Sequence, residues 1–172
     1  MNNVGFQIVI NTKGNIMRKY ISTLVIMLIF TISVFADGSQ DAMNFFNRYV
    51  NAANSYSSEI ADMYSPSAKI IRQVVKPDGT TQNVYTDTAT YIRQMKLGQA
   101  GAKLRQYKNT YTNVSITNLG NNKYKISSLR QPAGETYKLK TYMVVQKQPN
   151  GNWLIVEEMM QTKVQIFLKY AK

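Results

Sequence analysis

The spacing of apolar residues changes along the chain, from the period of a helix to the period of a strand. Helical spacing predicts three helices: one from a capping stretch at 38–41 to Tyr56, a short one in SEIADMY at 58–64, and one over 89–106. We expect Asp87 or Thr88 to cap the third helix, because short polar side chains accept hydrogen bonds from its free first-turn amides. Pro66 should end the second helix.

Residues that alternate between apolar and polar predict the strands. A run at 68–76 turns through Lys76-Pro77-Asp78-Gly79 and returns in TQNVYT, residues 81–86. Four more runs follow the third helix, over residues 111–119, 123–129, 136–148 and 153–170. We therefore predict an α+β fold, in which three N-terminal helical segments pack on a strongly curved antiparallel sheet to form a cone-shaped, cystatin-like roll.

The N-terminal region has the order of a secretory signal peptide. Arg18 and Lys19 follow Met17, an apolar run covers residues 20–35, and Val34-Phe35-Ala36 offers small residues at a cleavage site. We expect residues 17–36 to be a signal peptide cleaved after Ala36, and the mature domain, residues 37–172, to be exported to a bacterial periplasm or secreted. Residues 1–16 then form an upstream extension from a mis-called start. The alternative is an uncleaved membrane anchor.

The amino-acid composition excludes several kinds of catalytic and metal-binding site. The chain has no His and no Cys, so histidine bases, Ser-His-Asp triads, disulfides and the usual zinc ligands are absent. We expect no metal and no cofactor. The 21 Lys+Arg against 9 Asp+Glu leave the possibility of adhesion to an anionic membrane or cell wall. Gly98-Gln99-Ala100-Gly101 matches the Gly-x-x-Gly loop of RNA-binding modules, but the strand order differs, and we expect no nucleic-acid partner.

Two stretches, FFNRYVNAANSYSSEIADMYSPSAKI at 45–70 and NGNWLIVEEMM at 150–160, resemble nuclear-transport-factor-2-like (NTF2-like) domains, including the SnoaL-like polyketide-cyclase and ketosteroid-isomerase cones. The resemblance implies helices that close one side of a bent sheet around a pocket, and it makes a homodimer through the sheet face reasonable. The family's enzymes often carry a carboxylate or His after the Pro-x-Ala strand entry. In this chain the residues after that entry are Lys69-Ile70-Ile71-Arg72-Gln73, which include no acid and no His, so no catalytic residue of the family carries over. The matching positions are Phe46, Tyr49, Ala53, Ile60, Tyr64, Pro66, Ala68, Ile70, Trp153 and Ile155.

Glu158 is the best acidic candidate for catalysis. In a regular strand it shares a face with Leu154, Val156 and Met160, where it interrupts an apolar row. A carboxylate in an apolar pocket has a raised pKa and can act as an acid or base near neutrality. Alternatively, a bulge turns Glu158 to solvent, or it pairs with one of three arginines, Arg72, Arg93 and Arg130.

Aromatic and methionine side chains are expected to line the pocket or to fill the core beside it. The first hypothesis for function is a non-catalytic domain that binds a small apolar or amphipathic ligand, or a protein partner. The second is an isomerase-, dehydratase- or cyclase-type enzyme that uses Glu158 with a pocket tyrosine. The pocket candidates are Phe46, Tyr49, Tyr56, Tyr64, Tyr91, Met95, Trp153 and Met160.

Overall fold

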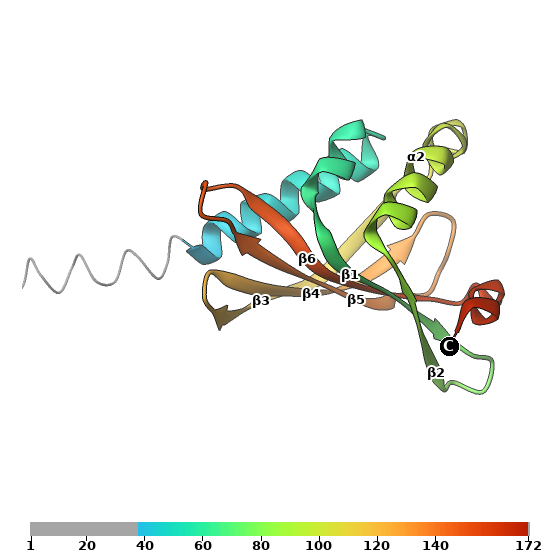
Figure 1. Ribbon diagram of the computed structural model, residues 1–172. Helices are drawn as coiled ribbons and strands as arrows, with labels where there is room; N and C mark the ends of the chain where they lie inside the picture. The colour runs from blue at the N-terminus through green and yellow to red at the C-terminus, as the bar shows by residue number, and fades with distance from the viewer. Residues whose placement is uncertain (1–37, 172) are drawn as a thin grey trace, which may run out of the picture. The chain divides into compact units, whose positions relative to one another are not determined.

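The computed structural model describes residues 38–171, which form helices and a six-stranded sheet (Figure 1). The expected extension at 1–16 and signal peptide at 17–36 lie outside the described residues. A helix, here called the N-terminal helix, covers residues 38–54 and includes the stretch 38–41 that was expected to cap it. The other elements are η1 (Ser58–Met63), β1 (Tyr64–Val75), β2 (Thr81–Thr86), α2 (Thr88–Leu104), β3 (Asn109–Gly120), β4 (Lys123–Pro132), β5 (Leu139–Lys147), β6 (Trp153–Thr162) and η2 (Gln165–Tyr170).

The sheet is mixed and open, with the strand order β2-β1-β6-β5-β4-β3. The β1–β2 hairpin and the β3–β6 meander are antiparallel, as predicted. The expectation of a wholly antiparallel sheet is wrong at one pair, because β1 and β6 run parallel. Tight turns fix strand direction only within each hairpin, whereas the long connection through α2 leaves the direction between the two blocks open.

The predicted cap of the third helix lies at the expected position. Asp87 caps α2, since its carboxylate accepts a 2.8 Å hydrogen bond from the amide of Thr90. Ser57 caps η1, which is a 3-10 helix. Gly98-Gln99-Ala100-Gly101 lies inside α2 and forms no separate loop.

Two strand boundaries differ most from the prediction. β1 begins at Tyr64, so Pro66 lies inside a strand and not after a helix. It occupies the irregular stretch between Tyr64 and Lys69 where the register with β6 shifts, and proline is tolerated at such bulges. At the other end, β6 stops at Thr162 and the apolar residues beyond it form η2.

The core lies between the helices and one face of the sheet. Phe46 and Tyr49 of the N-terminal helix pack in one cluster with Ile126, Val145 and Ile155 of three strands. Ile92 and Met95 bring α2 onto the same cluster. The two helices therefore cover the same face, and the space between them and the sheet is where a pocket can form. Within residues 38–171, no helix is long and apolar enough to cross a membrane.

Candidate functional site

A β-bulge in β6 decides which side chains face the helices. Val144 pairs with Glu157 and Val145 pairs with Ile155, so Val156 is the extra residue. The bulge reverses the alternation, and Ile155 and Glu158 are both fully buried on the helix-covered side. Leu154, which regular alternation placed beside Glu158, is only half-buried and stands apart from this core.

Glu158 sits in a closed hydrogen-bond network. The hydroxyl of Tyr49 donates to Oε1 at 3.1 Å, and the hydroxyl of Tyr64 donates to Oε2 at 3.1 Å. Arg72 forms the ion pair with Nη1 3.7 Å from Oε2, and its guanidinium lies 4.7 Å from the ring centroid of Tyr91. Of the three arginines considered as partners, Arg72 is thus the one that pairs with Glu158. Both carboxylate oxygens are satisfied within the protein.

The electrostatics of this cluster keep the tyrosines protonated. Burial raises the pKa of Tyr49 and Tyr64 well above the ordinary value, and the charge of Glu158 raises it further. Burial also raises the pKa of Tyr91. Burial acts to lower the pKa of Arg72, but Tyr91, Glu158, Tyr64 and Tyr49 all act to raise it, and the net shift is upward. The hydroxyls therefore act as hydrogen-bond donors at neutral pH.

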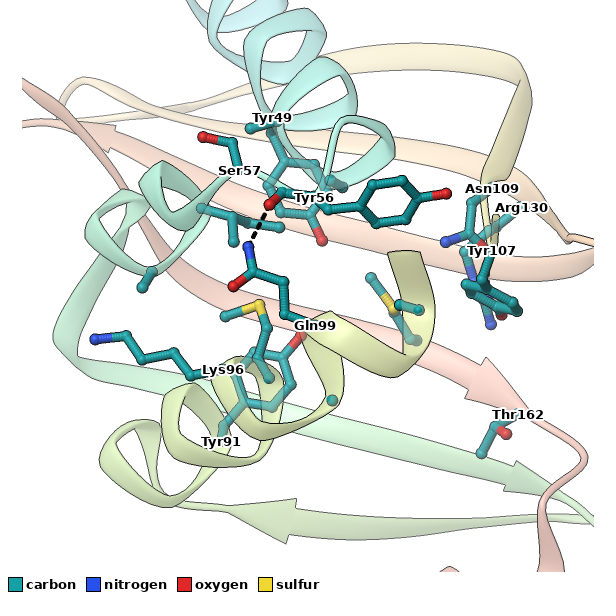
Figure 2. Close-up of a pocket in the computed structure, with 18 of the residues that line it drawn as sticks. Tyr49, Tyr56, Ser57, Tyr91, Lys96, Gln99, Tyr107, Asn109, Arg130 and Thr162 are labelled. Atoms are coloured by element: carbon teal, nitrogen blue, oxygen red, sulfur yellow. Dashed lines mark hydrogen bonds between the residues drawn. The ribbon is translucent and has the colours of Figure 1, made fainter. Parts of the chain in front are cut away.

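A pocket of about 320 Å³ opens next to this cluster, between the end of the N-terminal helix, η1, α2 and the sheet (Figure 2). Ala53, Met95 and Met160 form part of its apolar lining. Gln99 of α2 donates a hydrogen bond to the backbone carbonyl of Tyr56, which joins the two helical walls (Figure 2). A concave, mostly apolar site with a few polar groups is typical of small-molecule binding.

The structure brings five of the sequence-based candidates into the lining of this pocket: Tyr49, Tyr56, Tyr91, Met95 and Met160. Phe46 lies in the core with its ring edge-on to Tyr111. Trp153 packs against Tyr124 and lines a different surface hollow near Asp41. Tyr64 and Glu158 lie behind the lining, and Tyr49 and Arg72 are the network members that reach the pocket.

The sequence-based pocket candidates were all aromatic or methionine residues and did not include the other polar residues of the lining. Arg130 enters from β4, where Nη1 donates to Oδ1 of Asn109 at 2.8 Å and Nη2 donates to the carbonyl of Gln161 at 3.0 Å. Asn54 exchanges two 3.0 Å hydrogen bonds with the backbone of Asn109, which ties the N-terminal helix to β3. The sequence did indicate that Arg130 faces inward, because in β4 it lies on the same face as Tyr124 and Ile126, which are buried.

Acidic side chains are absent from the lining formed by the described residues, whereas Arg72, Lys96 and Arg130 contribute to it. Lys96 is exposed at the rim, and Arg72 is neutralised by Glu158. Nowhere in residues 38–171 do three or more His, Cys, Asp or Glu side chains gather in a way that could hold a metal ion.

Neither a protein-family model nor a curated protein matches the chain. Among solved structures, an NTF-2 like protein of unknown function from Shewanella oneidensis MR-1 is 14% identical with a TM-score of 0.54, over 72% of this chain and 98% of that one. A DUF3225-family protein of unknown function from Pectobacterium atrosepticum is 22% identical with a TM-score of 0.52, over 73% and 91%. A candidate ketosteroid isomerase from Shewanella frigidimarina is 17% identical with a TM-score of 0.50, over 68% and 91%. These likenesses concern architecture, and they show that this chain has the NTF2-like fold.

Proposed function

We propose that this chain is a binding domain that holds a small amphipathic molecule in the pocket between the N-terminal helix, α2 and the sheet. The observation that carries the proposal is the cavity of about 320 Å³, which combines walls of alanine, methionine and tyrosine with polar side chains such as Gln99, Asn109 and Arg130. Such a site gains affinity from apolar burial and orientation from its polar groups.

The position of Glu158 favours binding over catalysis. A general base must come within hydrogen-bond reach of the proton that it removes. Glu158 is fully buried, and its two oxygens already accept hydrogen bonds from Tyr49 and Tyr64. Because Tyr49 and Arg72 line the cavity while Glu158 and Tyr64 lie behind them, the geometry of Glu158 supports a structural role behind the pocket wall.

The proposal is tested by titrating the purified domain with N-phenylnaphthylamine, a neutral apolar dye that becomes fluorescent in apolar sites. Ala102 lines the pocket from α2, and Ala100 is an exposed residue of the same helix. Ala102→Trp should fill the cavity and weaken dye binding by about tenfold or more, the equivalent of ~1.4 kcal/mol. Ala100→Trp, the matched control, should bind as the wild type does.

Two results would contradict the proposal. One is the absence of saturable dye binding by the wild-type domain. The other is equal binding by the Ala102→Trp and Ala100→Trp variants, which would place the dye elsewhere on the surface. Native mass spectrometry of the purified domain adds an independent readout, since a ligand retained during purification appears as a mass increment.

A further inference from the structure

Two buried hydrogen-bond donors at the pocket have no partner within the described part of the chain: the hydroxyl of Tyr56 and Nε of Arg130. Both residues line the same cavity. Buried donors are nearly always satisfied in native proteins, and each unsatisfied one calls for an explanation. A ligand with acceptor atoms in this cavity would satisfy both donors.

Arg130 carries a charge that its surroundings do not balance. Arg130 is only 7% exposed. Its Nη1 and Nη2 atoms both donate hydrogen bonds to neutral oxygen atoms, Oδ1 of Asn109 and the carbonyl oxygen of Gln161. None of the ion pairs within residues 38–171 includes it. Arg72, by contrast, lies 3.7 Å from the carboxylate of Glu158. A buried cation without a counter-charge is costly, so an anion is the matching partner for Arg130.

Tyr56 adopts a left-handed backbone conformation, which glycine adopts more readily than other residues. It follows the N-terminal helix with φ at 60°, and the amides of Tyr56 and Ser57 close the helix end on the carbonyls of Ala53 and Ala52. A bulky residue pays a steric cost there, and backbone strain of this kind concentrates at functional sites. In Figure 2 the Tyr56 ring extends toward the side of the pocket where Arg130 and Asn109 lie. The strained backbone thus places a hydroxyl donor on the side of the pocket where Arg130 lies.

We propose that the ligand of this pocket is an amphipathic monocarboxylate, whose two oxygens accept hydrogen bonds from Arg130 Nε and Tyr56 Oη. One uncompensated guanidinium and one hydroxyl match a single negative charge with two acceptor atoms. The apolar tail lies along Ala53, Met95 and Met160. This assignment rests on the proposed binding function and adds to it the chemical class of the ligand.

The experiment compares decanoate with decanol, which have the same tail and differ in the head group, by calorimetric titration of the wild-type domain. Decanoate should bind roughly ten- to hundredfold more tightly, as expected for hydrogen bonds to a charged group. Equal affinities for the two compounds would overturn the carboxylate assignment and leave the proposed binding function standing. Binding of neither compound, together with a failure of dye binding, would overturn both.

Variants then locate the head group. Tyr56→Phe removes only the hydroxyl and should weaken decanoate binding about tenfold while decanol binding stays unchanged. Tyr85→Phe removes a hydroxyl from an exposed tyrosine outside the pocket and should leave both affinities unchanged. Arg130→Met keeps the length of the side chain and should abolish the preference for decanoate. Should Arg130→Met fail to fold, Tyr56→Phe decides alone, and unchanged decanoate binding by that variant overturns the assignment.

Discussion

The hydroxyl of Tyr49 donates a 3.1 Å hydrogen bond to Glu158, which lies 109 positions later in the chain. This bond joins the N-terminal helix to β6 in the middle of the sheet. Tyr64 connects β1 to the same carboxylate, and Arg72 adds the positive charge. The cluster therefore ties one helix and two strands together directly behind the pocket, and its loss should affect folding stability.

Glu158→Gln should lower the free energy of unfolding by about 3 kcal/mol, because it leaves the guanidinium of Arg72 without its counter-charge in a buried site. Urea denaturation followed by circular dichroism measures the change. Glu157→Gln is the matched control from the adjacent position. Its side chain is 29% exposed and lies 3.9 Å from the exposed Lys69. It also accepts a hydrogen bond from the hydroxyl of Tyr142, which the amide oxygen of Gln can still accept, so the substitution should change stability by less than about 1 kcal/mol. Equal effects of the two substitutions would contradict the structural role of Glu158.

The two tyrosines of the network should be energetically coupled. Tyr49→Phe and Tyr64→Phe each remove a donor to Glu158 and should each cost about 1–2 kcal/mol. Their hydroxyls lie 3.5 Å apart and share one acceptor group, so the cost of the double substitution should differ from the sum of the single ones. A double-mutant cycle in urea measures the coupling. Strict additivity would show that the two hydrogen bonds act independently.

Burial of the tyrosines predicts a loss of stability at alkaline pH. The folded-state pKa of Tyr49 and Tyr64 is raised well above the ordinary tyrosine value of 10.0, so near and above that pH the unfolded chain releases protons that the folded chain retains. Stability is therefore full below about pH 10 and falls above it, by at most about 1.4 kcal/mol per pH unit for each such group. The Tyr49→Phe/Tyr64→Phe double variant should show a shallower fall in urea midpoints between neutral and alkaline pH. An equal fall in the urea midpoints of the double variant and the wild type would contradict the assignment of this pH dependence to Tyr49 and Tyr64.

The local elements of the fold could be predicted from the sequence because their signals are local. Asp87 caps α2, the Lys76-Pro77-Asp78-Gly79 turn joins β1 to β2, and the period-two runs predict the meander. The parallel pairing of β1 with β6 could not be read in this way, since it depends on packing between segments separated by α2 and the meander. The spacing of hydrophobic residues indicates whether a segment forms a helix or a strand, but not whether two paired strands run parallel or antiparallel.

The pocket was predicted only in part, and for a similar reason. Aromatic and methionine candidates such as Tyr56 and Met160 stand out in the sequence, but the bulge at Val156 has no sequence signal of its own. Without it, Glu158 and Ile155 would occupy opposite faces of β6. Arg130 carried a readable signal, a charged residue at a core-facing strand position, which gains meaning only once its neighbours are known to be neutral.

Export of the domain remains a proposal that the first residues of the mature protein would test. Expression of the full chain in a bacterium should yield a mature N-terminus at Asp37, because Val34 and Ala36 place small residues at the cleavage positions. Ala36→Tyr should block cleavage and leave the longer chain in the membrane fraction. N-terminal sequencing and cell fractionation measure both outcomes. A wild-type chain that keeps its first 36 residues would contradict the proposed cleavage.

Gln99 should control how fast a ligand leaves the pocket. Its amide donates to the carbonyl of Tyr56 and so bridges α2 and the end of the N-terminal helix (Figure 2). A single neutral hydrogen bond contributes about 1 kcal/mol, so Gln99→Ala should speed dye dissociation several-fold in stopped-flow measurements with only a small change in urea midpoint. Gln94→Ala, at an exposed position of the same helix that does not line the pocket, is the control and should leave the rate unchanged. Identical dissociation rates for the two variants would show that the bridge between the helical walls does not gate the pocket.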